Sequence, residues 1–437
     1  MTVQLRCARC GAVYPVHQVR YMCDCGGLLD VSHDLEALRP EVNRYLFDGR
    51  LEGAPTPHVA PTINSGVWRY RELILPVTAD AIVSRPEGNT PLYHHPRLSS
   101  WVGLDAFYLK HEGENPTGSF KDRGMTVGVT QAGLLGARAV ACASTGNTSA
   151  SLAAYAALAG IPAIVFIPAG KIAAGKLAQA LAYGARTLQV EGDFDAAMRL
   201  VRRVCDELNV YLLNSLNPFR LEGQKSIVFE IIQGFRWQPP DWIVLPAGNL
   251  GNTAAFGKAL YELKHLGLVD RVPRLAAVQA EGASPFYRSF RTHFRERITM
   301  QAETVATAIR IGAPVSHERA IFSIEWTEGL VTQVSDCEIM DAKAIVDGVG
   351  IGCEPASAAS VAGTHRLVAE GIIQANQSVV AVLTGNLLKD PLATVAYHTG
   401  EWPDAAYPNR PLSVRAELGA VREVIEETVD GKPRSNS

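Results

Sequence analysis

Residues 137–167 read ARAVACASTGNTSASLAAYAALAGIPAIVFI. Two short apolar runs, Ala137–Ala143 and Ala163–Ile167, flank an alanine-rich stretch, Ala150–Leu158, that contains neither proline nor glycine. The runs have the length and the small or β-branched residues of buried strands, and the stretch between them favours a helix. Because a strand, a helix and a second strand in this order form a unit with parallel strands, the segment predicts a parallel sheet covered by a helix.

The same alternation continues along most of the chain. Further buried strands are predicted at Thr187–Val190, Trp242–Leu245, Arg274–Val278 and Val379–Leu383. Further helices are predicted at Gly175–Leu181, Phe194–Leu208 and Asn252–Leu266. This pattern favours the α/β class, with helices on both faces of parallel sheets. A chain of 437 residues is long enough for two such three-layer domains.

The composition limits the partners of the protein. Charged residues make up 19% of the chain and the net charge is −3, so a clustered basic surface for nucleic acid is not expected. The sequence has no apolar run of 18 residues, and its first residues do not follow the pattern of a secretory signal. We therefore expect a cytoplasmic protein that does not enter the membrane and acts on a small molecule.

Half of the eight cysteines lie in the first 25 residues, at Cys7, Cys10, Cys23 and Cys25. Thiolates on two tight turns can surround a tetrahedral metal such as zinc. The second pair has one intervening residue where two are usual, so the residues leave two interpretations open. This knuckle either binds zinc or is a degenerate form that does not. In both cases it is expected to be an appendage to the main fold.

Residues 112–124 read EGENPTGSFKDRG and follow a short predicted strand, Ala106–Lys110. Before Asp122 this stretch has two glycines and a proline, which predict a loop, and a helix is predicted to start near Asp122. An ammonium group at the positive end of a helix has a lowered pKa, and only the neutral amine attacks an aldehyde. Taken alone, Lys121 would still be interpreted as a solvated surface charge.

The lysine segment and EGNTPL at 87–92 closely resemble motifs of the fold-type II pyridoxal-phosphate enzymes. This family includes threonine synthase, threonine dehydratase, cysteine synthase and the tryptophan synthase β chain, and the resemblance runs from about residue 85 to 400. It implies that Lys121 is the catalytic residue and holds pyridoxal 5′-phosphate as a Schiff base. It also implies two α/β domains with the cofactor between them, and a homodimer.

Residues 246–253, PAGNLGNT, follow a predicted strand and open a predicted helix. Glycines permit a tight turn, and free N–H groups at a helix start can converge on a phosphate. Such turns are common, so the signal is weak by itself. The resemblance assigns the cofactor phosphate to Gly248, Asn249, Gly251, Asn252 and Thr253.

Residues 144–149, STGNTS, lie between a predicted strand and a predicted helix. By physical chemistry they form either a plain helix cap or a carboxylate site. The resemblance assigns Asn147 to the 3′-oxygen of the cofactor, and substrate or cofactor oxygens to Ser144, Thr145, Thr148 and Ser149. It also assigns Thr384, at the end of the last predicted strand, to the pyridine nitrogen.

Within the family, two segments resemble threonine synthases: NSLNPFRLEGQK at 214–225 and TVATAIRIGAP at 304–314. Thr148 also stands where dehydratases usually have histidine. The resemblance implies conversion of O-phosphohomoserine and water to L-threonine and phosphate. Amide and cationic groups suited to a substrate phosphate occur at Asn217, Arg220 and Lys225. The alternatives are another enzyme of this fold, such as a cysteate synthase or a threonine dehydratase, and a catalytically silent amino-acid-binding homologue.

The expected domain boundaries follow from these assignments. Residues 1–30 form the cysteine knuckle, and residues 106–215 form a small domain that carries the lysine and the carboxylate loop. Residues 31–105 and 216–410 form the large domain. Residues 411–437 form a C-terminal helix and a disordered tail.

Overall fold

The computed structural model describes residues 3–52, 64–169, 174–191 and 200–430, apart from residues 202 and 206. The start of the predicted helix Phe194–Leu208 and the predicted tail at 431–437 lie outside the described residues. The described chain contains three sheets, and the α/β class is confirmed. None of the described helices has both the length and the apolar character needed to cross a membrane.

The largest sheet has six strands in the order β12-β11-β10-β13-β5-β4. All neighbouring strands are parallel except for the edge pair β4 and β5. Its strands are β4 (Leu92–His94), β5 (Ala106–His111), β10 (Trp242–Pro246), β11 (Arg274–Ala280), β12 (Leu330–Val334) and β13 (Ser378–Leu383). Alternate residues of β10 point to opposite faces, with Ile243 and Leu245 in one apolar cluster and Trp242 and Val244 in another. The sheet is therefore buried on both faces, as a three-layer domain requires.

The second sheet has four parallel strands in the order β8-β7-β6-β9. They are β6 (Ala139–Ala143), β7 (Ala163–Pro168), β8 (Arg186–Val190) and β9 (Val210–Leu212). The strand-helix-strand unit read from residues 137–167 is confirmed, with β6 paired in parallel to β7. This sheet also has one apolar cluster on each face.

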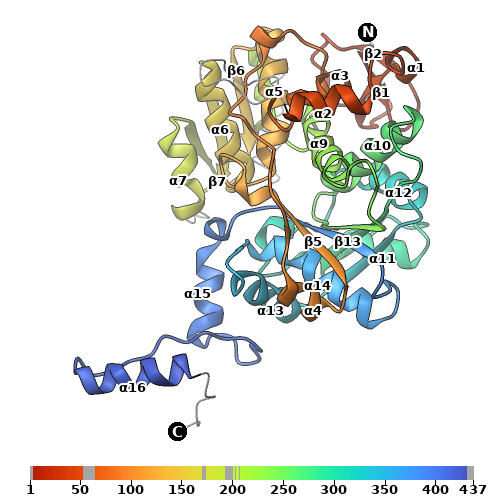
Figure 1. Ribbon diagram of the computed structural model, residues 1–437. Helices are drawn as coiled ribbons and strands as arrows, with labels where there is room; N and C mark the ends of the chain where they lie inside the picture. The colour runs from red at the N-terminus through yellow and green to blue at the C-terminus, as the bar shows by residue number, and fades with distance from the viewer. Residues whose placement is uncertain are drawn as a thin grey trace.

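The helices of the main body cover these sheets (Figure 1). The helices longer than one turn in this part are α4 (Pro96–Val102), α5 (Lys121–Leu134), α6 (Asn147–Ala159), α7 (Ala174–Ala182), α9 (Pro218–Gly234), α10 (Gly251–His265), α11 (Pro285–Arg291), α12 (His317–Trp326), α13 (Asp336–Asp347) and α14 (Pro355–Ala369). Residues from α9, α10 and α12 pack on one face of the six-stranded sheet, and residues from α4, α13 and α14 pack on the other. Helix α5 packs against both α6 and α9, so it joins the two sheets.

One predicted boundary differs from the structure. Residues 106–111 were assigned to the small domain, but they form β5, which pairs with β13 along its whole length in the large sheet. The boundary was placed before β5 because the lysine loop follows this strand directly in the sequence. The four-stranded sheet begins only with β6, after α5. The other boundaries remain predictions.

The N-terminal segment forms a small antiparallel sheet in the order β2-β1-β3. Its strands are β1 (Val3–Cys7), β2 (Val13–Pro15) and β3 (Leu29–His33). Leu5, Leu29 and Val31 are buried and belong to the apolar cluster that includes α9 and α10. Two helices, α1 (Leu35–Leu38) and α2 (Arg44–Glu52), and the short α3 (Arg71–Ile74) lie at the same end of the molecule (Figure 1).

The C-terminal segment extends away from the body (Figure 1). It contains α15 (Pro391–Thr399) and α16 (Leu418–Val429). Tyr397 anchors α15, because its side chain is buried and its hydroxyl donates to Asp341 at 2.6 Å. No residue of α16 is buried.

Candidate active site

Lys121 is the first residue of α5. The loop before it is hydrogen-bonded to the end of β13: the Phe120 N–H donates to the Thr384 carbonyl at 3.0 Å, and the Asn386 N–H donates to the Gly118 carbonyl at 2.9 Å. The predicted helix start and the predicted strand end are therefore brought together. The lysine lies where the large sheet meets the helix that leads to the small one.

The environment of Lys121 favours the neutral amine. Burial, with a smaller contribution from the positive charge of Arg220, lowers the pKa of Lys121 to about 7, and the carboxylate of Glu354 opposes this shift. The ammonium lies 4.1 Å from the centre of the Phe120 ring. At neutral pH, Lys121 would therefore be uncharged in about half of the protein molecules. Lys121 can therefore act both as a nucleophile and as a proton carrier.

The loop around Lys121 is held by buried polar groups. Asp122 accepts hydrogen bonds from the Thr117 N–H at 2.7 Å, the Thr117 hydroxyl at 2.6 Å and the Ser151 hydroxyl at 2.6 Å. Arg123 has no exposed surface and pairs with Glu112 at 2.5 Å and with Glu230 at 2.8 Å. Because every one of these groups has a partner, the loop is fixed on both sides of the lysine.

Glu354 is a site residue that the sequence reasoning missed. It precedes α14, is buried, and accepts from the Asn147 amide at 3.1 and 3.3 Å. Its backbone N–H donates to the Gly385 carbonyl at 3.1 Å. Burial raises its pKa, although Asn147 and nearby positive charges oppose the shift. The signal available in the sequence was a carboxylate directly before the proline of a helix start, but its partner lies 207 residues away.

The predicted phosphate loop follows β10 and opens α10. Leu250 has a φ of 63°, and α10 begins at Gly251 without a side-chain cap on its first amides. A Cβ on Gly248 would lie 3.0 Å from the Cα of Ile309, so glycine is needed there for close approach. Asn249 bridges two segments, because its amide donates to Ser215 at 3.4 Å and its side-chain oxygen accepts from the Val315 N–H at 3.3 Å.

Three buried polar atoms in or beside this loop have no hydrogen-bond partner among the described residues. They are Asn252 Oδ1, Thr253 Oγ1 and Gln224 Oε1. Buried polar groups are normally paired, so a cluster of unpaired ones indicates a ligand that brings its own donors and acceptors. Uncapped helix amides beside unpaired polar side chains suit a phosphate. The residues present therefore fit a phosphorylated cofactor.

Arg220 and Gln224 lie one helical turn apart on α9 and share one face. Arg220 is close enough to influence the pKa of Lys121, and Gln224 Oε1 would lie 3.4 Å from a Cβ on Gly251. This face of α9 thus connects the lysine to the phosphate loop. Arg220 donates through Nη1 to the Leu213 carbonyl at 3.1 Å and keeps its Nε unpaired.

The structure contradicts the prediction for Lys225 and gives Asn217 a different contact. Lys225 is fully buried, and its ammonium contacts the Leu73 carbonyl, Glu222 and Glu262, each at 2.6 Å. All three of its donors are used inside the protein, so none is left for a substrate phosphate. Asn217 is buried as well and caps α9 by accepting from the Phe219 N–H at 3.0 Å.

The predicted carboxylate loop connects β6 to α6. Helix α6 begins at Asn147, after Gly146 at the N-cap position, and this start has no side-chain cap. Ser144 accepts from the Gly146 N–H at 3.2 Å, and Ser149 is buried and donates to the Gly146 carbonyl at 2.8 Å. Thr145 and Thr148 are half-buried. The loop thus keeps uncapped helix amides beside the site, as an anion requires.

Thr384 follows β13, where ligands of parallel sheets bind. It is buried, and its hydroxyl lies 3.1 Å from the hydroxyl of Ser357 on α14. Ser357 also accepts from the Gly385 N–H at 2.9 Å, which fixes its position. A neutral hydroxyl pair therefore faces the site at the strand end, with no charged partner in this contact.

Comparisons with known proteins agree with this geometry. Residues 83–385 match the family model described as pyridoxal-phosphate dependent enzyme. The threonine synthase of Methanocaldococcus jannaschii is 43% identical over 97% of this chain and 99% of its own. That of Methanosarcina acetivorans is 46% identical over 96% of this chain and 98% of its own. The chain therefore belongs to the pyridoxal-phosphate dependent enzymes, and pyridoxal phosphate is its cofactor.

Within that family, the chain groups with the threonine synthases, because it is similar to two of them over nearly the full length of both chains. The crystal structure of threonine synthase from Escherichia coli has the same fold, with a TM-score of 0.63 and 18% identity over 97% of this chain and 100% of that one. The predicted fold-type II architecture is confirmed.

Proposed function

We propose that this protein catalyses the conversion of O-phosphohomoserine and water to L-threonine and phosphate. The observation that carries the proposal is the pairing of Lys121 with Arg220. Lys121 has a pKa of about 7, and the charge of Arg220, whose Nε has no hydrogen-bond partner among the described residues, contributes to that shift. A proton carrier next to a phosphate-binding group is what loss of a phosphate ester from an amino acid requires. The near full-length similarity to threonine synthases supports this choice of substrate.

The roles of the cofactor-binding residues stay proposals. Lys121 would hold the cofactor aldehyde, and Gly248, Asn249, Gly251, Asn252 and Thr253 would hold its phosphate. Thr384 would face the pyridine nitrogen and, being neutral, would leave it unprotonated. Asn147 would contact the 3′-oxygen, and its amide is positioned by Glu354 at 3.1 Å. When bound, the cofactor supplies an electron-withdrawing ring that makes the substrate carbons acidic.

The remaining steps depend on side chains of this chain. The substrate carboxylate would bind at the uncapped start of α6, near Ser144, Thr145, Thr148 and Ser149. The freed amine of Lys121 would take a proton from Cα and later from Cβ. Arg220 would hold the γ-phosphate and stabilise the charge that grows on it as it leaves. A proton would then be delivered to Cγ, which becomes the methyl group of threonine. Water would add its hydroxyl at Cβ, with its other proton passing to the released phosphate, and Lys121 would return a proton to Cα.

The test is a product assay with the cofactor-loaded protein. O-phosphohomoserine should yield L-threonine and inorganic phosphate in a one-to-one ratio. O-phosphoserine with sulfite, and threonine itself, are the matched controls, since a cysteate synthase or a dehydratase would use those substrates instead. Release of neither product from O-phosphohomoserine, by protein that shows the visible absorbance of bound cofactor, would reject the proposed substrate.

A homodimer also remains a prediction, and α16 offers a surface for it. Leu418, Val421, Ile425 and Val429 are 75%, 37%, 55% and 79% exposed and recur every three or four residues, so they form one apolar stripe. The helix projects from its own body (Figure 1), so a second copy can cover it in a two-fold arrangement. Light scattering should show that the wild-type protein is a dimer. Ile425→Glu should weaken the association, so that part of this variant is monomeric at the same concentration. A monomeric wild type would reject the prediction.

A further inference from the structure

The sulfurs of Cys7, Cys10, Cys23 and Cys25 form a compact cluster in which every pair lies within 4.8 Å. The Cys7 and Cys25 sulfurs are 3.6 Å apart, and those of Cys10 and Cys23 are 3.5 Å apart. A tetrahedral site with zinc–sulfur bonds of about 2.3 Å has sulfurs about 3.8 Å apart. A disulfide would need about 2.0 Å. The sequence left a zinc-binding and a degenerate knuckle open, and the sulfur geometry fits the first.

The backbone around the cluster is shaped for thiolates. The N–H groups of Arg9 and Cys10 point at the Cys7 sulfur, at 3.4 and 3.5 Å. A Cβ on Gly27 would lie 2.7 Å from the same sulfur, so only glycine leaves room for it. Hydrogen bonds to the ligand atoms and a tight turn beside them are the usual surroundings of a structural metal. The unusual one-residue spacing of Cys23 and Cys25 is therefore no obstacle.

The knuckle contacts the large domain on one side. Arg9 forms an ion pair with Glu318 of α12 at 2.6 Å. Arg319, also on α12, donates to the Leu29 carbonyl of β3 at 2.5 Å. The buried face of the three-stranded sheet adds Leu5 to the same apolar cluster.

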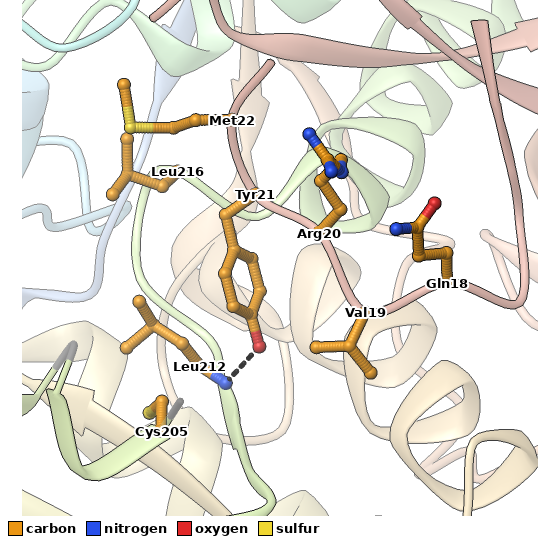
Figure 2. A pocket seen from close by; sticks show the side chains of 8 residues that line it. All are labelled: Gln18, Val19, Arg20, Tyr21, Met22, Cys205, Leu212 and Leu216. Carbon is orange, nitrogen blue, oxygen red and sulfur yellow. Dashed lines mark hydrogen bonds between the residues drawn. The ribbon is translucent and has the colours of Figure 1, made fainter. Parts of the chain in front are cut away.

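The segment Gln18–Met22, between β2 and Cys23, contacts the small domain on the other side (Figure 2). The Tyr21 hydroxyl accepts from the Leu212 N–H of β9 at 2.7 Å, and its ring lies 5.7 Å from the ring of Tyr211. The segment lines a pocket together with Leu212, Leu216 and Cys205. The Tyr21 hydroxyl therefore satisfies a backbone N–H of the edge strand β9 that would otherwise be free to pair with a further strand.

We propose that the four cysteines bind one zinc ion, and that the metal holds the Gln18–Met22 segment as a strap between the two domains. A sheet of three short strands has too little core to fix a loop by itself, and metal binding supplies the missing stability. Leu212 is followed within a few residues by the start of α9, which carries Arg220. The strap thus supports the edge of the small sheet beside the candidate active site. The strap itself lies outside residues 83–385, which the family model matches.

The metal is tested first, by elemental analysis of reduced, cofactor-loaded protein. We expect one zinc per chain in wild type and in Cys337→Ser, an exposed cysteine of α13. We expect its loss in Cys10→Ser and in Cys23→Ser. Replacement by cobalt should give the visible spectrum of a tetrahedral thiolate site. Equal, substoichiometric zinc in wild type and Cys10→Ser would overturn the proposal.

The strap is tested by hydrogen exchange at Leu212. Chelation of the metal, or Cys23→Ser, should speed exchange of the Leu212 amide, while amides of α14 keep their protection. Tyr21→Phe is the matched control: it should keep the zinc and lose only the Leu212 protection. Unchanged exchange at Leu212 after complete loss of zinc would overturn the strap. Neither readout depends on catalysis, so both stand apart from the test of the proposed function.

Discussion

The titration of Lys121 can be followed through the rate at which the apoprotein captures its cofactor. With a pKa of about 7, the neutral fraction of this amine is about one in eleven at pH 6, one half at pH 7 and ten in eleven at pH 8. The capture rate should rise about fivefold from pH 6 to pH 7, less than twofold from pH 7 to pH 8, and then level off. An ordinary lysine would be neutral in about one molecule in three thousand at pH 7 and would gain tenfold per pH unit.

The assay mixes apoprotein with pyridoxal phosphate in a stopped-flow instrument and follows the visible band of the lysine-linked cofactor. The titration of the cofactor itself is removed by dividing by the rate with a simple soluble amine. Lys121→Ala is the blank and should give no band. A normalised rate that still rises tenfold between pH 8 and pH 9 would refute the lowered pKa.

Two variants test the physical cause of the shift, because they change neighbouring charges in opposite directions. Arg220→Met removes a positive charge that lowers the pKa of Lys121, so the plateau should begin at higher pH. Glu354→Gln removes a negative charge that raises it and keeps a hydrogen-bond acceptor for Asn147, so the plateau should begin at lower pH. A shift in the same direction for both variants would contradict the electrostatic explanation.

Three further predictions concern turnover and packing. Lys121→Ala should abolish turnover while circular dichroism shows an intact fold; measurable turnover would remove Lys121 from the mechanism. Arg220→Ala should raise the KM for O-phosphohomoserine about ten- to a hundredfold, the effect of a lost charge-assisted hydrogen bond, and should change binding of a phosphate-free analogue much less. Gly363→Ala places a Cβ 2.4 Å from Val278 Cγ2 and should lower the free energy of unfolding by about 1–3 kcal/mol in urea titrations. Gly133→Ala in α5, where a Cβ meets nothing within 4 Å, is its control and should not destabilise.

Much of the fold could be predicted from local patterns. The apolar runs at Ala163–Ile167 and Trp242–Leu245 became β7 and β10, because strands buried on both faces leave a continuous apolar signal. Among the parallel strands, β9 and β12 were missed, and the short strands β1 to β4 were missed as well. Val210–Leu212 has only three residues, which is too short for a pattern to stand out from its surroundings.

The candidate site was predicted less evenly. Lys121 could be singled out because its motif is contiguous in the sequence. Lys225 was misjudged because a cation that grips a ligand and a cation buried against Glu222 and Glu262 look the same in one dimension. Glu354 was missed for the converse reason, since its contact with Asn147 depends on the packing of two distant helix starts.

The hydrogen bonds between the lysine loop and the end of β13 separate two tasks. Lys121 and Thr384 are fixed to the same sheet, through Phe120 at 3.0 Å, whereas the loop at residues 144–149 belongs to the other sheet. A protein engineer could vary Ser144, Thr145, Thr148 and Ser149, with Asn147 kept for the cofactor, to admit new amino acids without loosening the attachment of the coenzyme at Lys121. The fold thus places a loop that can be changed to alter substrate selectivity next to a reactive lysine whose position stays fixed.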